Sequence, residues 1–177
     1  DQKMNIGYVD LQISTFHAFC QKILEHHAID IGLSNSFQLL TDSESWMMLR
    51  KHLYDMPLKY YRPLGNPSRH IHELLKHFAK CKDELISPAE YLAYVEGLRL
   101  NNDQSEPEGK HGQISDVQRL QEIADAYHFY NQLLIDNASF DFGDLLFYAV
   151  KLFRERPHIL AAYQKRFRYI LVDEFQD

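Results

Sequence analysis

Apolar residues recur at three- and four-residue intervals along most of the chain, which is the spacing of an amphipathic helix. The pattern predicts helices over residues 16–24, 46–53, 71–79, 91–98, 114–134 and 142–153, with a further short helix beginning at Pro157. Each stretch gathers its large apolar side chains, such as Phe78 or Leu134, on one face. We therefore expect a mostly α fold.

Polar residues at the starts of these stretches have the pattern of helix caps. Thr41 followed by Glu44, and Ser87 followed by Glu90, have the spacing of a capping box, in which each side chain accepts the backbone N–H of the other residue. Pro88 occupies the first helical position after Ser87, where proline is favoured. Single caps are predicted at Thr15 and Asp141.

Two short segments near the ends of the chain predict strands instead. Residues 10–14 alternate apolar and polar side chains, and residues 169–172 (YILV) are continuously apolar, as in a buried parallel strand. Residues 101–112 are polar, contain proline and glycine, and predict a solvated, mobile loop. This layout fits a helical insertion whose two ends return to one α/β sheet.

Composition is that of a globular protein and restricts how the chain can bind nucleic acid. With 45% hydrophobic residues, 25% charged residues and a net charge of −6, any DNA contact must use basic side chains that are grouped locally. No apolar run reaches the roughly 18 residues of a membrane span. Cys20 and Cys81 match neither a disulfide nor a zinc pattern, which fits reduced thiols in a cytoplasmic protein. Since the chain starts at Asp1 and stops just after an apolar strand, we expect a piece of a longer protein.

Two carboxylates follow the second predicted strand directly. In α/β sheets, ligands bind beyond the carboxyl ends of strands, which is where Asp173 and Glu174 would lie. Phosphoryl transfer requires a carboxylate that holds magnesium and a second group that orients the attacking water. Asp173 is the candidate magnesium ligand and Glu174 the candidate base. For an apolar strand followed by Asp-Glu alone, an acidic loop that faces solvent is an equal alternative.

The sequence around these acids resembles a known family. Residues 172–177 (VDEFQD) are similar to the second motif of the UvrD/Rep-type superfamily 1 DNA helicases, in which an aromatic residue follows VDE. Residues 15–17 (TFH) resemble the TFHS segment of that family, and residues 140–146 (FDFGDLL) resemble its DFDDLL segment, in the same order. Weaker matches fall at residues 79–88 and 137–138, so the resemblance covers nearly the whole chain.

Two positions depart from the family pattern. Ala18 stands where the family usually has Ser, which would remove one hydroxyl contact to a phosphate. Gly143 replaces the usual second Asp of DFDDLL, which would loosen the first turn of that helix. Neither position belongs to the chemistry of ATP hydrolysis.

The resemblance implies a RecA-like α/β P-loop NTPase domain interrupted by a helical insertion, often called 1B. Residues 1–27 and 140–177 would belong to the motor domain, and residues 28–139 to the 1B-like insertion. The resemblance also implies an ATP-dependent DNA helicase that uses ATP and Mg²⁺. Such a protein would move 3′ to 5′ on single-stranded DNA as a monomer and unwind duplex at a junction, with no membrane partner.

The same resemblance assigns roles to individual residues. Catalytic roles fall on Asp173, Glu174, Gln176 and Asp177, with Asp173 as the Mg²⁺ ligand. Contacts to single-stranded DNA fall on Thr15, Phe16 and His17, which supply a hydroxyl, a stacking ring and an imidazole. Without the resemblance, a plain helix cap at Thr15 and a Phe16 ring packed under the sheet would be the preferred interpretation.

The phosphate-binding loop of such motors does not occur in the sequence. No Gly-x-x-x-x-Gly-Lys-Ser/Thr segment is found among the 177 residues, so we expect the chain alone to be inactive as an ATPase. Two alternatives remain open. One is a helical DNA-binding, partner-binding or regulatory module without motor activity, and the other is the motor subunit of a helicase–nuclease.

Histidine and lysine placement adds two further hypotheses. The ten histidines include no H-x-x-x-H pair, so a zinc site is not favoured. Two groups of basic residues are candidates for local basic patches, although helical lysines usually form a solvated face. Their candidate members are Lys76, Lys80, Lys82, Lys165, Arg166 and Arg168.

Overall fold

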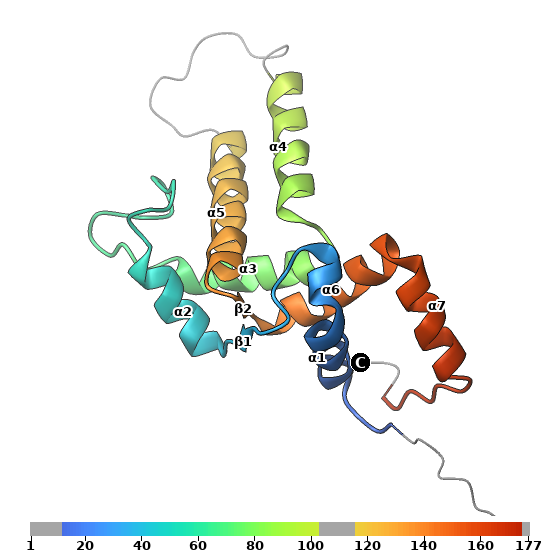
Figure 1. The fold of residues 1–177 in the computed structure, drawn as a ribbon. Helices are drawn as coiled ribbons and strands as arrows, with labels where there is room; N and C mark the ends of the chain where they lie inside the picture. Colours follow the sequence, from blue (N-terminus) through green and yellow to red (C-terminus); the bar gives the residue numbers. More distant parts are fainter. Residues whose placement is uncertain (1–11, 103–115, 175–177) are drawn as a thin grey trace, which may run out of the picture.

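Helices dominate the part of the molecule that the structure describes (Figure 1). The computed structural model describes residues 12–102 and 116–174. In chain order the elements are α1 (Phe16–His27), the 3-10 helix η1 (Ala28–Ile31), β1 (Gln38–Leu39), α2 (Asp42–Lys51), α3 (Ile71–Asp83), α4 (Pro88–Asn102), α5 (Asp116–Asp136), β2 (Ser139–Phe140), α6 (Phe142–Glu155) and α7 (Pro157–Arg166). The expected mostly α fold is confirmed.

The predicted caps begin their helices as expected. The Thr41 hydroxyl accepts the Glu44 N–H at 3.3 Å, and Glu44 Oε2 accepts the Thr41 N–H at 2.8 Å. Ser87 and Glu90 make the same exchange at 3.2 and 2.8 Å. The Thr15 hydroxyl accepts an N–H of the first turn of α1 at 3.2 Å. Because these N–H groups have no partner inside the helix, the capping residues determine where each helix begins.

The larger core lies where α2, α3 and α5 meet. It contains the buried side chains of Leu49 from α2, Phe78 from α3, and Tyr127 and Tyr130 from α5. The Phe78 ring stacks on the rings of Tyr127 and Tyr130, with centroid distances of 5.1 and 5.6 Å. Helix α4 packs along α5, and the two helices project together from the body in Figure 1.

A second group of apolar side chains joins α1 to the last two helices. Leu24 of α1 packs in one cluster with Leu145 of α6. Ile23 of α1 packs in another with Leu152 of α6 and Ile159 of α7. Segments from the two ends of the described chain therefore share a core, while the helices between them form a core of their own.

The strands do not form where the sequence pattern predicted them. Residues 12–14 and 169–172 form no strand in the described part of the chain, and residues 10 and 11 lie outside it. Tyr169, Ile170 and Leu171 are 90%, 74% and 99% exposed. A strand needs a neighbour for its backbone N–H and C=O groups, and no described segment pairs with this run. The prediction of strands at both ends is therefore wrong for these residues.

The one ladder among the described residues is short and lies elsewhere. β1 pairs in parallel with β2, with Gln38 opposite Ser139 and Leu39 opposite Phe140. Phe37 beside β1 contacts the Phe140 ring, at a centroid distance of 4.3 Å. Two-residue strands are too short to show an alternating pattern, so the sequence carried no signal for them.

Three remaining expectations concern the loop, the membrane and the thiols. Residues 103–112 of the predicted loop lie outside the described residues, while Asn101 and Asn102 belong to the end of α4. Within the described ranges, every helix is too short or too polar to cross a bilayer. Cys20 and Cys81 are free thiols, as expected.

Candidate functional site

The residues predicted to contact DNA lie on an exposed turn at the start of α1. Thr15 is the N-cap, and Phe16 and His17 are the first two helical residues. Phe16 is 60% exposed, so the alternative in which its ring packs under a sheet is not what the structure shows. The Thr15 oxygen accepts a bond from the first turn, and its O–H can still donate. The turn thus presents groups that suit phosphates and unpaired bases.

The start of α6 lies directly beside this turn. Phe142, the first residue of α6, contacts the His17 ring edge-on, with the ring centroids 5.9 Å apart and an interplanar angle of 74°. Phe142 is itself 47% exposed. Helices α1 and α6 also pack against each other. The structure therefore brings together residues 15–17 and 140–146, two of the segments that carry the family resemblance.

A buried ionic cluster anchors the first turn of α6. Asp141 and Asp144 form a capping box in which Asp141 Oδ1 accepts the Asp144 N–H and Asp144 Oδ2 accepts the Asp141 N–H, both at 3.0 Å. Lys82 of α3 places its Nζ 2.6 Å from Asp141 Oδ2 and 2.7 Å from Asp144 Oδ1. The Tyr130 hydroxyl of α5 donates to Asp141 Oδ2 at 3.1 Å. Three helices are thus tied together at one point.

Lys82 corrects the hypothesis of a basic patch on α3. Its side chain is 1% exposed, so it cannot belong to a solvent-facing patch with Lys76 and Lys80, which are exposed. Asp144 is likewise buried. Lys82 follows Phe78 by four residues on α3 and so lies on the same helical face as that buried ring, which is a sequence signal that could have marked it as buried.

The cluster contains a buried cation, the buried Asp144 carboxylate and the partly buried Asp141 carboxylate, and their pKa values respond accordingly. Burial lowers the pKa of Lys82, but Asp144 and Asp141 outweigh it and raise that pKa above its usual value. Burial tends to raise the pKa of Asp141, but the Lys82 ammonium holds it below its usual value. Burial dominates at Asp144 and raises its pKa to about 7. Because the cluster carries one excess negative charge, Asp144 is the group that takes up a proton first.

Buried tyrosines surround the cluster with neutral hydroxyl donors. The Tyr127 hydroxyl donates to the Ile86 carbonyl at 3.0 Å, and the Tyr148 hydroxyl donates to Asn131 Oδ1 at 2.9 Å. Burial raises the pKa of Tyr127, Tyr130 and Tyr148 well above the usual value, so all three stay protonated. These bonds satisfy the hydroxyls inside an otherwise apolar core.

The candidate catalytic acids lie at the end of the exposed run formed by residues 169–172. Asp173 and Glu174 are both exposed and occupy a bend. Asp173 Oδ1 accepts the Glu174 N–H at 3.0 Å, and Glu174 has a φ of +50°, in the left-handed region. The described residues form no sheet that joins these acids to the start of α1, which the sequence-based assignment requires. The candidate residues Gln176 and Asp177 lie outside the described residues, as does Phe175.

Magnesium is the metal that the predicted chemistry implies. The oxygen donors of Asp173 and Glu174 suit this ion, which proteins commonly hold by one or two carboxylates together with phosphates and water. Among the described residues, no three His, Cys, Asp or Glu side chains are grouped to hold a metal. Several histidines have other partners: His27 pairs with Asp30 at 3.2 Å and His52 with Asp55 at 3.1 Å.

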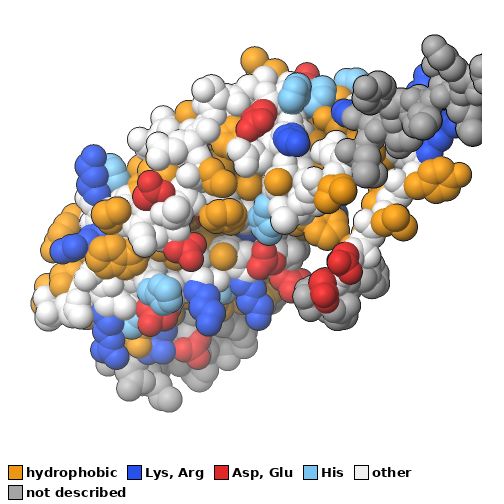
Figure 2. All heavy atoms as spheres, turned by 90° about the horizontal axis from the view of Figure 1, so that it is seen from below, with side chains coloured by type: hydrophobic (Ala, Val, Ile, Leu, Met, Phe, Trp, Pro, Cys, Tyr) orange, Lys and Arg blue, Asp and Glu red, His pale blue; other side chains and the backbone are white. Residues whose placement is uncertain are grey.

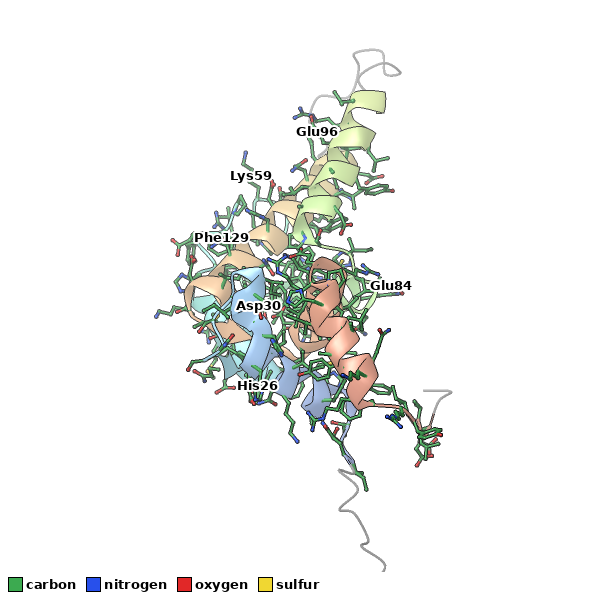
Figure 3. The ribbon with its side chains drawn as sticks, turned by 45° about the vertical axis from the view of Figure 1, so that its right-hand side comes forward. His26, Asp30, Lys59, Glu84, Glu96 and Phe129 are labelled. Atoms are coloured by element: carbon green, nitrogen blue, oxygen red, sulfur yellow. The ribbon has the colours of Figure 1, made fainter. Side chains whose placement is uncertain are left out.

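Basic side chains are interspersed with acidic and hydrophobic ones on the face shown in Figure 2. Glu122 of α5 accepts hydrogen bonds from three backbone N–H groups in the connection between α2 and α3. The donors are Lys59, Tyr60 and Tyr61, at 3.0, 2.9 and 3.4 Å. The Arg119 guanidinium lies 4.4 Å from the centre of the Tyr60 ring. The Lys59 side chain points away from the body (Figure 3). A carboxylate therefore already fills this group of N–H donors.

Comparison with protein families gives a match over almost the whole sequence. Residues 3–177 match the family described as UvrD/REP helicase N-terminal domain. This match includes the segments at residues 15–17, 140–146 and 172–177.

Curated relatives agree with this match. The chain is 31% identical over 173 residues to the ATP-dependent DNA helicase PcrA of Bacillus subtilis, covering 97% of the chain and 20% of that protein. It is 32% identical over 165 residues to DNA helicase II of Haemophilus influenzae, covering 93% and 19%. It is 31% identical over 178 residues to a probable DNA helicase II homolog of Rickettsia felis, covering 97% and 23%. The chain spans about a fifth of the length of these relatives.

Proposed function

Because the chain belongs to the UvrD/REP helicase N-terminal domain family, we propose that it is part of an ATP-dependent DNA helicase that moves along single-stranded DNA and unwinds duplex. The observation that carries this proposal is the match over residues 3–177, within which the three motif-like segments occur in order. The relatives named as ATP-dependent DNA helicase and DNA helicase II support it. The proposed direction of movement is 3′ to 5′, and the proposed location of the protein is the cytoplasm.

We further propose that residues 1–27 and 140–177 belong to the motor domain and residues 28–139 to an inserted helical domain. The separation of the two cores supports this division, since α1, α6 and α7 pack with one another while α2, α3 and α5 share the other core. Residues from Ala28 to Leu39 also pack with α6, so the boundary near residue 27 runs through a continuous apolar cluster.

In this proposal the acids after residue 172 manage hydrolysis and the start of α1 contacts the strand. Asp173 would hold the ion, and Mg²⁺ when bound would neutralise charge on the phosphates. Glu174 would accept a proton from the attacking water and orient it. Thr15 would donate to a phosphate, while Phe16 and His17 would present rings to unpaired bases. Gln176 and Asp177 would complete the acidic motif.

The 177 residues would not hydrolyse ATP by themselves. They contain no Gly-x-x-x-x-Gly-Lys-Ser/Thr segment, so the backbone nest and the lysine that bind the phosphates would come from the rest of the longer protein. We therefore propose that this chain supplies the acids and part of the DNA track, but not the phosphate-binding loop.

The test uses the longer protein that carries this chain. Its ATP hydrolysis is measured with and without single-stranded DNA, and its unwinding is measured on duplexes with a 3′ or a 5′ single-stranded tail. Hydrolysis stimulated by single strands, with unwinding of the 3′-tailed duplex, is the expected result. Nucleic-acid binding without hydrolysis would instead identify a regulatory module, and cleavage of the strands would identify a helicase–nuclease.

A further inference from the structure

The first turn of α6 lies between the insertion helix α3 and the turn at the start of α1. On one side, the carboxylates of Asp141 and Asp144 hold Lys82 Nζ at 2.6 and 2.7 Å. On the other side, Phe142, which lies between these two acids in the sequence, contacts the His17 ring at a centroid distance of 5.9 Å. A displacement of this turn would therefore move a ring that helps to place His17.

We propose that Lys82 is a positioning residue for the single-strand track. By holding Asp141 and Asp144, it fixes the first turn of α6 and so fixes the Phe142 ring against His17. The inference rests on the proposed function, because it takes residues 15–17 as the contact with unpaired bases. Lys82 itself is 1% exposed and does not touch DNA; it acts through the helix that it anchors.

Gly143 shows how closely the Lys82 side chain follows the backbone of α6. A Cβ atom added at Gly143 would lie 3.1 Å from Lys82 Cδ and 3.2 Å from Lys82 Cβ. The aliphatic part of the lysine thus lies against the turn while its ammonium bridges the two acids. In the family segment that residues 140–146 resemble, an Asp usually occupies the position of Gly143, and here the glycine leaves the room that the lysine occupies.

Tyr130 fixes the far side of the same cluster. Its hydroxyl donates to Asp141 Oδ2 at 3.1 Å, and its ring centre lies 5.2 Å from Lys82 Nζ. The ammonium is therefore held by two carboxylates and one ring, from α5 and the start of α6. These contacts together restrict the position of the turn relative to α3.

Two variants of the longer protein test the inference. Gly143→Ala places a methyl group 3.1 Å from Lys82 Cδ and 3.2 Å from Lys82 Cβ, so the lysine or the turn must shift by a few tenths of an ångström without the loss of a charge. Lys82→Met combined with Asp144→Asn removes the ion pair without leaving Asp144 charged and unpaired. Lys51→Met is the matched control, because Lys51 is an exposed lysine near the end of α2. Thermal unfolding of each protein confirms that it is folded.

The measurements are the rate of ATP hydrolysis without DNA, the rate at saturating single-stranded DNA, and the DNA concentration that gives half of the stimulation. Both test variants should raise the half-stimulating concentration by about tenfold while the rate without DNA stays within about twofold, because only strand binding depends on the position of His17. Lys82→Arg, which keeps the charge, should retain part of the affinity for single-stranded DNA that the two test variants lose. A purely structural role for Lys82 would instead lower thermal stability with no change in the half-stimulating concentration.

The outcomes separate this inference from the proposed function. If the unmodified protein is stimulated by single-stranded DNA and Gly143→Ala has the same half-stimulating concentration, the positioning role is overturned and the helicase proposal stands. If the unmodified protein shows no stimulation, the proposed function fails and the inference fails with it. Gly143→Ala decides the matter even if the double variant does not fold.

Discussion

Lys82 and Asp141 are 59 positions apart in the sequence, and Lys82 Nζ lies 2.6 Å from Asp141 Oδ2. This contact joins α3, in the proposed insertion, to the first turn of α6, in the proposed motor segment. Asp141 is at the same time the N-cap of α6, so one carboxylate both begins a helix and receives a buried ammonium. The stability of the fold should therefore depend strongly on this pair.

Removing the ammonium alone should destabilise the chain. Lys82→Met leaves the carboxyl groups of Asp141 and Asp144 without their cation, which should lower the free energy of unfolding by about 3–5 kcal/mol. Urea unfolding followed by circular dichroism measures this. Lys51→Met, at an exposed site, should change the free energy by about 0.5 kcal/mol or less. A loss for Lys82→Met as small as that of the control would contradict the burial of this side chain.

Stability should also fall as the pH rises from about 4 to about 7 and level off above that. The pKa of Asp144 is raised to about 7 in the folded chain, whereas the pKa of an Asp in the unfolded chain lies near its usual value of 3.8. Between these two pKa values the folded state keeps a proton on Asp144 that the unfolded state has released. The stabilisation of the folded state by this proton is complete at low pH and is lost as the pH rises to the folded pKa. The slope should be about −1.4 kcal/mol per pH unit within this range.

Asp144→Asn provides the control for this dependence. Asparagine keeps an oxygen for the Asp141 N–H but cannot titrate, so the fall in unfolding free energy between about pH 5 and pH 7 should largely disappear. Urea titrations at several pH values compare the two proteins. Parallel curves for both would show that Asp144 does not hold a proton in the folded state.

The capping box of α2 should contribute a smaller, local stabilisation. Thr41→Ala removes the hydroxyl that accepts the Glu44 N–H, which should lower the free energy of unfolding by about 1 kcal/mol. Thr41→Ser keeps the hydroxyl and should retain nearly all of the stability. Thermal unfolding of the pair tests this, and equal losses for alanine and serine would argue against a hydroxyl cap.

Replacing the candidate base should separate nucleotide binding from hydrolysis. In the longer protein, Glu174→Gln should preserve ATP binding and slow hydrolysis by about 10² to 10⁴-fold, because only the group that accepts the proton from water is lost. Binding of a fluorescent ATP analogue and steady-state hydrolysis measure the two effects. Normal turnover in the variant would show that Glu174 is not the base.

Loss of the exposed ring at the start of α1 should weaken binding of single strands. Phe16→Ala should raise the dissociation constant for single-stranded DNA by about tenfold, within the range of one base–aromatic stack, and leave the salt dependence unchanged. Tyr94→Ala is a matched control, since Phe16 and Tyr94 are both 60% exposed. Fluorescence anisotropy in the longer protein compares them, and equal affinities would remove Phe16 from the track.

Local features of the sequence determined the helices and their starts. Thr41 with Glu44 and Ser87 with Glu90 are three residues apart, so the groups that satisfy each helix end are supplied within one turn. The apolar spacing that predicted the helix over residues 142–153 likewise depends only on near neighbours. For the same reason the family resemblance, which rests on short ordered segments, could be stated from the sequence.

Tertiary structure decided what depends on distant partners. The run at residues 169–172 has the composition of a strand, but a strand forms only where another segment supplies hydrogen bonds, and the described chain supplies none there. Lysine is usually a surface residue, but the carboxylates of Asp141 and Asp144 make the burial of Lys82 favourable. In both cases the sequence fixes the chemical group, while its environment comes from residues far along the chain, because burial and pairing are properties of the packed assembly of helices.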